Sequence, residues 1–222
     1  MIVDALEMSG VLPPAASPSW TAPLSLQVPT GSFVTLVTPP IQAGAFFRMT
    51  LGLEDPRAGV VRVLGESPRG LGRAALRALR RRIGSSLLPD GLMANVTLRA
   101  NIALPLVFGD GRTNDDADDA ADDVLAQFGL AAYADYRPSD LSPDTRQVAA
   151  LARAVAARPA LLLLHDPLTS VTNIDAVRLL TLCRDYASTI VAAVHGEDEA
   201  VCMMADSAAV WDERGYREIV RA

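Results

Sequence analysis

Two short apolar runs, "ALLLLH" at 160–165 and "TIVAAV" at 189–194, constrain the fold of this chain more than any other feature. A strand with one face in water alternates apolar and polar residues, whereas these runs are apolar at nearly every position. Strands of this kind are covered on both faces, as in the parallel sheets of α/β proteins. A helical pattern at 174–187 lies between them, so the sequence predicts a strand–helix–strand unit with a right-handed crossover.

Other segments extend this α/β pattern in both directions. Further strands are predicted at 24–28, 33–37, 59–65, 208–211 and 217–220, and a further helix at 145–158. Another helix is predicted to start after Thr113 and Asn114, which can cap it, and six Asp residues fill its first turns. Negative charge is favourable at a helix N-terminus, so we interpret these Asp side chains as a solvated face. The Pro-rich stretch 11–23 is interpreted as an irregular connection.

Composition excludes several classes of function. A chain of 222 residues is long enough for one sizeable domain, and its net charge of −6 argues against nucleic acid as a partner. Cys183 and Cys202 are the only cysteines, so no disulfide framework is expected. The chain starts without a signal-peptide pattern and has no run of about 18 apolar residues, so a cytoplasmic location is predicted. All 20 basic residues are Arg, which excludes any mechanism that needs a lysine ammonium.

The stretch "FVTLVTPPIQAGAFFRMTLGL" at 33–53 has the layout of a phosphate-binding loop, because a short apolar strand passes through a turn into an apolar helix. This loop interrupts a longer stretch, "LSLQVPTGSFVTLV…RMTLGLEDPRAGVVRVLGE", and three further stretches are "NVTLRANIALPL", "RPSDLSPDTRQVAALARAVAARPALLLLHDPLT" and "VAAVHGEDEA". In their order and spacing, these four pieces resemble the ATP-binding subunit of an ABC transporter over nearly the whole chain. The chain looks most similar to bacterial lipid and lipoprotein transport systems, including the phospholipid-asymmetry (Mce-type) group.

The resemblance implies a P-loop NTPase-like ABC ATPase fold of the α/β class. Its core sheet would be mostly parallel, with an N-terminal antiparallel β part and a helical subdomain. A single domain is therefore predicted over 1–222, with the helical subdomain inserted at about 86–145.

The loop at 38–46 departs from the family's phosphate-binding sequence G-x-x-x-x-G-K-[ST]. The two glycine positions hold Thr38 and Ala43, and the lysine and hydroxyl positions hold Gly44 and Ala45. Pro39 agrees with the family's usual sequence. We expect the helix to start at about 45, where its first amides can still face an anion.

The other family motifs are altered as well. The strand that should end in Asp-Glu ends in His165 and Asp166, and a neutral imidazole is a poor ligand for magnesium. The signature loop reads "LSPDT" at 141–145, where Ser142 is kept and the glycines are replaced by Pro143 and Asp144. The later histidine of the family pattern is matched by His195.

Two loop positions also differ from the family. Leu88 stands where the resemblance implies the glutamine of the magnesium-sensing loop, and Thr172 where it implies an aspartate. The sequence therefore predicts no catalytic residue and no bound metal ion, and ATP and magnesium binding that is weak or absent. The remaining nucleotide contacts would be Pro39, Ser142 and His195. A metal site made by the two histidines with Asp166 is the alternative to two polar groups left beneath an empty pocket, and we favour the latter.

The resemblance also implies a partner. In the family, the region at 88–106 accepts a helix of the membrane permease, so Leu88, Leu92, Met93 and Val96 are predicted to dock it. The cluster Arg80, Arg81 and Arg82 is interpreted as a helix end, with a membrane-proximal role as the alternative.

The predicted function is that of a non-hydrolysing (pseudo-ATPase) subunit with a structural or regulatory role in a membrane transport complex, with lipid-related cargo. It would lie on the inner face of the membrane through a permease, paired with an intact ATPase paralogue or with a second copy. Two alternatives stay open. One is a weak or partner-dependent ATPase, and the other is a free cytosolic interaction protein on a recruited ABC fold.

Overall fold

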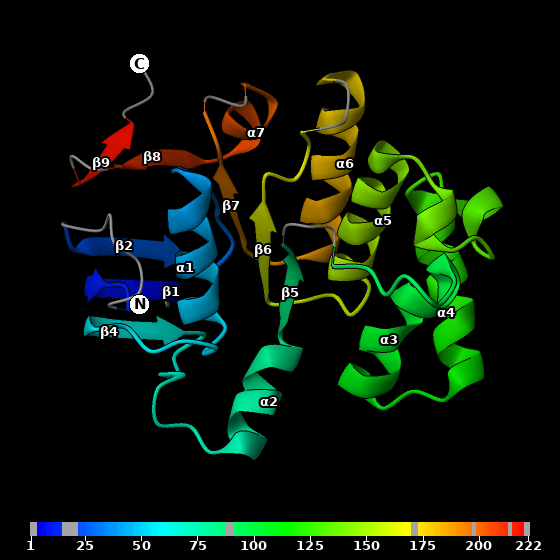
Figure 1. The fold of residues 1–222 in the computed structure, drawn as a ribbon, viewed down its shortest axis with the longest axis horizontal. Helices are drawn as coiled ribbons and strands as arrows, with labels where there is room; N and C mark the ends of the chain where they lie inside the picture. Colours follow the sequence, from blue (N-terminus) through cyan, green and yellow to red (C-terminus); the bar gives the residue numbers. More distant parts are fainter. Residues whose placement is uncertain are drawn as a thin grey trace.

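The computed structural model describes residues 4–14, 22–87, 91–169, 173–196, 199–212 and 215–219 of the 222-residue chain. Within these ranges the strands form a large sheet and a small sheet, with helices packed around them (Figure 1). The predicted positions Leu88 and Thr172 lie outside the described residues, as does most of the Pro-rich stretch predicted to be an irregular connection at 11–23.

The large sheet has the strand order β5-β6-β7-β3-β8-β9. Its strands are β3 (Phe33–Val37), β5 (Ile83–Ser86), β6 (Leu161–His165), β7 (Ile190–Val194), β8 (Ser207–Asp212) and β9 (Gly215–Ile219). Every neighbouring pair is parallel except β8 and β9. The prediction of an α/β fold with a mostly parallel core sheet is therefore confirmed.

The central strands are buried on both faces, as their apolar runs predict. All five residues of β6 and all five of β7 are buried. Along β6, Leu162 and Leu164 pack into one apolar core, and Leu161 and Leu163 pack into the core on the opposite face. The sheet therefore separates two hydrophobic cores, and side chains that alternate along each strand fill both of them.

The small sheet is antiparallel, with the order β2-β1-β4. Its strands are β1 (Asp4–Leu12), β2 (Leu24–Pro29) and β4 (Ala58–Val63). The sequence did not predict β1, because register shifts between Met8 and Val11 interrupt the apolar alternation of this strand. Gly59 of β4 permits the close pairing of this strand with β1, since a Cβ atom on Gly59 would lie 2.3 Å from the Gly10 carbonyl oxygen.

Seven α-helices are described within the stated ranges. They are α1 (Pro40–Thr50), α2 (Arg73–Arg81), α3 (Leu98–Asp110), α4 (Asn114–Gln127), α5 (Pro143–Val155), α6 (Asn173–Tyr186) and α7 (Glu199–Met204). Two short 3₁₀ turns, Ala131–Tyr133 and Pro138–Asp140, connect α4 to α5. None of the helices in the described part of the chain has the length and apolar character needed to cross a bilayer.

Helices α3 and α4 lie side by side at the end of the molecule farthest from the small sheet (Figure 1). Thr113 caps α4 as predicted, because its hydroxyl oxygen accepts the Asp116 amide at 3.2 Å. The apolar face of α4 is buried, including Ala117, Val124 and Leu125, while the Asp side chains of its first turn face solvent. The boundary of a helical subdomain at about 86–145 stays a prediction.

Candidate functional site: the carboxyl edge of the central strands

The carboxyl ends of β3, β6 and β7 meet at one edge of the large sheet, because the three strands are parallel neighbours. The residues that follow them are Thr38 and Pro39, Asp166, and His195. In open α/β sheets, ligands bind outside the carboxyl ends of the strands, so this edge is the candidate functional site.

Thr38 fastens the segment after β3 to both neighbouring strands. Its amide donates to the Val194 carbonyl of β7 at 3.0 Å, and its hydroxyl donates to the Trp211 carbonyl of β8 at 2.7 Å. The side chain is buried, so both polar groups of Thr38 are satisfied within the chain.

Helix α1 begins at Pro40, and the expected start at about 45 is therefore wrong. The physical reason is the pair Pro39–Pro40, because proline fixes φ near its helical value and is favoured in the first turn. Ala43, Gly44 and Ala45 consequently lie inside the helix. Ala43 and Ala45 are buried and Gly44 is half-buried.

The N-terminus of α1 offers few amide donors. Pro39 and Pro40 have no N–H group, and the amides of Gln42 and Ala43 both donate to the Pro39 carbonyl at 3.0 Å. Among the described residues, Ile41 is the first-turn position whose amide keeps a hydrogen free for a ligand, and its side chain is 69% exposed. Pro39 itself is exposed.

Asp166 is held tightly at the end of β6. Its Oδ1 accepts the His195 amide at 2.6 Å, and its own amide donates to the Ala193 carbonyl at 2.9 Å. Its φ of 42° is positive, a conformation that non-glycine residues rarely adopt outside constrained sites. Gln147 of α5 donates to the Asp166 carbonyl at 2.9 Å. The carboxylate is therefore a structural acceptor that joins β6 to β7.

His165 lies beneath this edge and is 8% exposed. Its ring packs against Phe47 with the ring centroids 5.6 Å apart, and no hydrogen-bond partner for Nε2 is found among the described residues. Burial lowers the pKa of the imidazole, and the nearby Asp166 carboxylate opposes that shift only in part. Since Nε2 lies 3.7 Å from Asp166 Oδ2, the two side chains are close but are not hydrogen-bonded.

The three predicted nucleotide contacts are only partly brought together. Pro39 and His195 are exposed and follow the neighbouring strands β3 and β7. Ser142 instead caps α5, where its Oγ accepts the Thr145 amide at 3.3 Å and lies 2.9 Å from the Thr145 hydroxyl. No hydrogen bond between described residues links Ser142 to the strand ends, so the joint role of these three residues stays a prediction.

The predicted docking segment is an irregular stretch held by a residue that the sequence did not single out. Asn101 is fully buried, and its amide nitrogen donates to the carbonyls of Met93 at 3.1 Å and Thr97 at 3.0 Å. Its Oδ1 accepts the Met93 amide at 2.7 Å. Met93 is 46% exposed, while Leu92 and Val96 are half-buried. A polar residue inside the apolar run "ANIALPL" was the available signal for Asn101.

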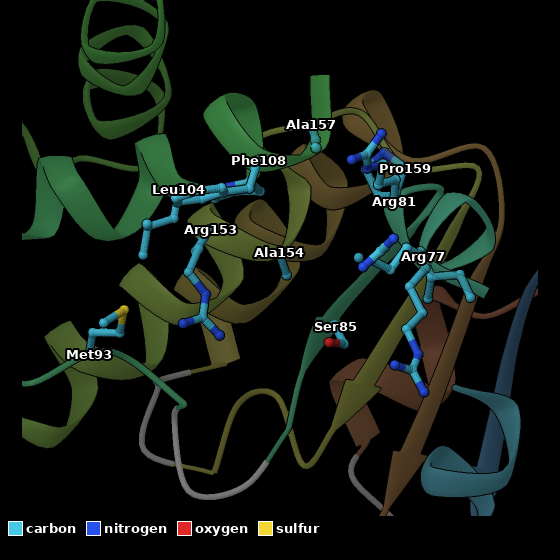
Figure 2. A pocket seen from close by; sticks show the side chains of 15 residues that line it. Arg77, Arg81, Ser85, Met93, Leu104, Phe108, Arg153, Ala154, Ala157 and Pro159 are labelled. Atoms are coloured by element: carbon cyan, nitrogen blue, oxygen red, sulfur yellow. The ribbon is translucent and has the colours of Figure 1, made fainter. Parts of the chain in front are cut away.

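A groove of about 560 Å³ lies close to this segment, between α2, α3, α5 and β5 (Figure 2). Met93 is the predicted docking residue that lines it. Arg77 and Arg81 of α2 lie across the groove from Leu104 and Phe108 of α3, and Arg153 of α5 lies beside Leu104 (Figure 2). The groove therefore differs in chemistry from the edge of the central strands.

Comparison with known proteins relates this arrangement to one family. The sequence profile described as "ABC transporter" matches residues 43–169. The "Lipoprotein-releasing system ATP-binding protein LolD" of Chromohalobacter salexigens is 35% identical over 138 residues, which cover 62% of this chain and 58% of that protein. The "Methionine import ATP-binding protein MetN" of Caulobacter vibrioides is 36% identical over 171 residues, which cover 74% of this chain and 50% of that protein. The chain thus spans half to three-fifths of the length of these relatives.

A solved structure supports the fold independently of close sequence similarity. One chain of the dimeric ATP-binding cassette MJ0796, in a post-hydrolysis state bound to ADP and Pi, superposes on this chain with a TM-score of 0.82 at 20% identity. The match covers 98% of this chain and 100% of that one. At this identity the likeness shows the fold alone.

These findings correct one expectation from the sequence. The inference that the chain takes no cofactor, with ATP and magnesium binding weak or absent, is contradicted, because the family and relatives that it matches are ATP-binding proteins. ATP with magnesium is the cofactor that the family implies. The substitutions at Gly44 and Ala45 establish only that a lysine and a hydroxyl are missing from those two positions.

The residues at the strand edge fit such a cofactor in part. The Ile41 amide at the start of α1 and the exposed His195 are placed where phosphates could lie. Gly44, Ala45 and His165 supply no ammonium group, hydroxyl or hard oxygen for the phosphates and the metal ion. These three residues therefore do not support a hydrolytic step. Because the family profile covers more than half of the 222 residues, the chain belongs to the ABC transporter family.

Proposed function

We propose that this chain is a non-hydrolysing ATPase-type subunit with a structural or regulatory role in an ABC transport complex. The observation that carries the proposal is the engagement of Asp166, the carboxylate at the position where the family places its water-activating group. A general base must be within reach of the proton that it takes. The Asp166 carboxylate instead accepts a main-chain amide at 2.6 Å, which holds it against β7.

The neighbouring position supports the same proposal. Magnesium in phosphoryl transfer is held by oxygen ligands, and His165 offers a buried imidazole whose lowered pKa keeps it neutral. Phosphoryl transfer depends on positioning and on charge stabilisation, and both would be reduced here. Binding of ATP and its hydrolysis are separable, so the proposal concerns turnover and leaves the family's cofactor in place.

The setting that we propose is the inner face of a membrane, where a permease holds the chain. The exposed Met93 and the half-buried Leu92 and Val96 would form part of the docking surface. Pairing with an intact ATPase paralogue or with a second copy is supported by the dimeric state of the MJ0796 cassette. Lipid-related cargo is supported by the likeness to LolD, which is named for lipoprotein release. We also propose one domain over 1–222 with a helical subdomain at about 86–145.

A partner-dependent ATPase is the second candidate. It is favoured by His195, which is exposed beside Pro39 at the end of β7 and matches the family's histidine. In this case a second subunit would supply the groups that Gly44 and Ala45 lack.

One experiment separates these candidates. The full-length chain is tagged in its native host and purified from detergent-solubilised membranes, and both ATP binding and phosphate release are measured on the product. The proposal predicts that a permease co-purifies with the chain. It also predicts that any phosphate release by the complex comes from a co-purified intact ATPase paralogue. Phosphate release by a complex in which this chain is the sole ATPase-type subunit would favour the second candidate, and a chain without a permease would favour the free interaction protein.

A further inference from the structure

The groove between α2 and α3 has a floor made by β5 and α5 (Figure 2). Ser85 and Ala154 lie at this floor, and the two elements approach closely at Gly84. A Cβ atom on Gly84 would lie 2.0 Å from the Ala154 carbonyl oxygen, so the backbone contact leaves no space beneath the groove. The volume of about 560 Å³ above this floor lies in the range of clefts that bind small molecules.

The α2 wall of the groove carries positive charge that the chain does not neutralise. Arg77 and Arg81 are one turn apart, so they share a face of the helix, and both are exposed. Within the described part of the chain, neither guanidinium group has a salt bridge or a hydrogen bond, whereas the next arginine, Arg82, lies 3.6 Å from Glu66. Like charges at this spacing on a helix repel each other, so an anion bound between them would stabilise the pair.

The other arginines at the groove are already used within the fold. Arg80 donates to two main-chain carbonyls that follow α1, at 2.7 Å and 2.9 Å. Arg153 of α5 donates to the Gly91 carbonyl. The C-terminal dipole of α2 favours Arg81, but Arg77 lies in the middle of the helix, where that effect is absent. The charge that is open to a ligand therefore resides on Arg77 and Arg81.

The α3 wall is apolar. Phe108 near the end of α3 is 71% exposed, and Met93 at the groove is 46% exposed. Leu104 lies one turn before Phe108, and Figure 2 shows both side chains at the groove. Large apolar side chains beside a cleft favour a ligand that removes them from water. The groove thus places an apolar surface opposite two unneutralised cations.

Helix α2 is poorly supported by the rest of the chain. It has nine residues, of which Leu79 is the buried one, and it projects beyond both sheets (Figure 1). Helices shorter than about 12 residues are marginal in water without tertiary packing. A ligand held between α2 and α3 would contact both helices and so stabilise α2.

We propose that this groove binds a small amphiphilic anion, a phosphate monoester of an apolar chain, with its phosphate on Arg77 and Arg81 and its chain along Phe108 and Leu104. A phosphate monoester carries a charge of about −2 at neutral pH, so one head group neutralises both arginines. Guanidinium groups also donate paired hydrogen bonds to phosphate oxygens. The inference goes beyond the proposed function, because binding at this groove needs neither ATP nor a second subunit.

The first test is isothermal titration of the purified full-length chain with decyl phosphate below its micelle-forming concentration. We expect saturable binding of one molecule per chain, and Arg77→Gln with Arg81→Gln should weaken it at least about tenfold, because charge-assisted hydrogen bonds are lost. Arg73→Gln is the matched control, since Arg73 is an exposed arginine of the same helix that does not line the groove. Phe108→Ala should weaken binding about fivefold, because apolar contact area is removed. Equal affinities of the wild type and the double variant would overturn the proposal.

Further ligands test the two halves of the site on the wild type. Glycerol 3-phosphate has the same head group on a polar body and should bind at least about tenfold more weakly than decyl phosphate. Equal binding of these two compounds would exclude the apolar wall from the site. Decanoate has a similar chain and one charge, and an affinity as high as that of decyl phosphate would contradict the dianionic head group.

Thermal unfolding and vesicle flotation complete the test. Decyl phosphate should raise the unfolding midpoint of the wild type and of Arg73→Gln, but not that of the double variant, because only the first two bind it. The midpoints without ligand show whether each variant folds. Binding to phosphatidylcholine vesicles that contain phosphatidylglycerol, with no binding of monomeric decyl phosphate, would refute the proposal in favour of a membrane surface.

Discussion

The carboxyl edge of the central strands and the groove beside α2 are both surfaces where this fold could bind a ligand, yet they are built in opposite ways. At the edge, Thr38 and Asp166 are bonded within the chain, and His165 is buried beneath them. At the groove, Arg77 and Phe108 are left to solvent. The edge uses its polar side chains to join strands, whereas the groove presents charged and apolar groups that the chain does not use.

The two surfaces differ in whether their side chains are used for folding or remain available for association. Polar groups satisfied inside the fold stabilise it but have little capacity left for a reaction. Exposed apolar and unneutralised charged groups do the reverse, because they contribute little to folding and much to association. The comparison therefore favours a subunit that acts mainly through its contacts with a partner.

The largest effect is expected beneath the groove. Gly84→Ala should destabilise the protein by about 3 kcal/mol, because the new Cβ atom would collide with the Ala154 carbonyl and push α5 away from β5. The midpoint of urea unfolding measures this change. Gly72→Ala is the control, since a Cβ atom there meets nothing within 4 Å, and the loss of a glycine at the N-cap of α2 should cost about 1 kcal/mol or less. Equal costs for the two variants would show that the groove floor is not rigid.

The second effect concerns the edge. Asp166→Ala should cost about 2 kcal/mol, because it leaves the His195 amide without its acceptor and removes a buried polar contact between β6 and β7. Asp166→Asn keeps an acceptor oxygen and should cost less than about 1 kcal/mol. Both are measured by urea unfolding, and a cost for Asp166→Ala as small as that for Asp166→Asn would remove the structural role that we assign to this carboxylate.

Most of the fold could be predicted from periodicity. The uninterrupted apolar runs of β6 and β7 indicated a two-sided parallel sheet, and Thr113 indicated the start of α4. Strand β1 could not be found in this way, because a bulge near Gly10 breaks its alternation.

The candidate site was harder to predict than the fold. The resemblance singled out Pro39, Asp166 and His195, which follow three neighbouring strands of the large sheet, but their role in binding stays a prediction. It could not give the start of α1, which begins closer to β3 than expected because of Pro39 and Pro40. The expectation that the lysine and hydroxyl missing at Gly44 and Ala45 mean a missing cofactor was wrong, because the chain matches an ATP-binding family over residues 43–169. The role of Asp166 depends on a hydrogen bond to a residue 29 positions away, and no local pattern encodes such a contact.

The third effect concerns the hydrogen bond that the Thr38 hydroxyl makes at the edge. Thr38→Val should cost about 1 kcal/mol, because the Trp211 carbonyl loses a buried donor at 2.7 Å. Thr181→Val is the matched control, since its hydroxyl donates to the Val177 carbonyl on an exposed helix face. Thermal unfolding should show a larger loss of stability for Thr38→Val than for Thr181→Val. The reverse order would contradict the structural role of the Thr38 hydroxyl at the edge.

The smallest effect is a dependence of stability on pH. Burial lowers the pKa of His165 in the folded state, so the unfolded chain takes up the proton first as the solution is acidified. The contribution of His165 to stability is therefore lost as the pH falls through about 6.5, the ordinary pKa of histidine. His165→Asn should flatten the unfolding free energy between about pH 7 and about pH 5 relative to the wild type. A slope unchanged by His165→Asn would refute this assignment.

The most direct test of the non-hydrolysing role is the effect of Asp166→Asn on turnover. The transport complex is purified through a tag on this chain, and its rate of phosphate release from ATP is compared between the wild type and Asp166→Asn. This substitution keeps the acceptor for the His195 amide and removes the charge that a base requires. We predict equal rates, whereas a rate that falls by a factor of about 100 or more in the folded variant would identify Asp166 as a working base and contradict the account.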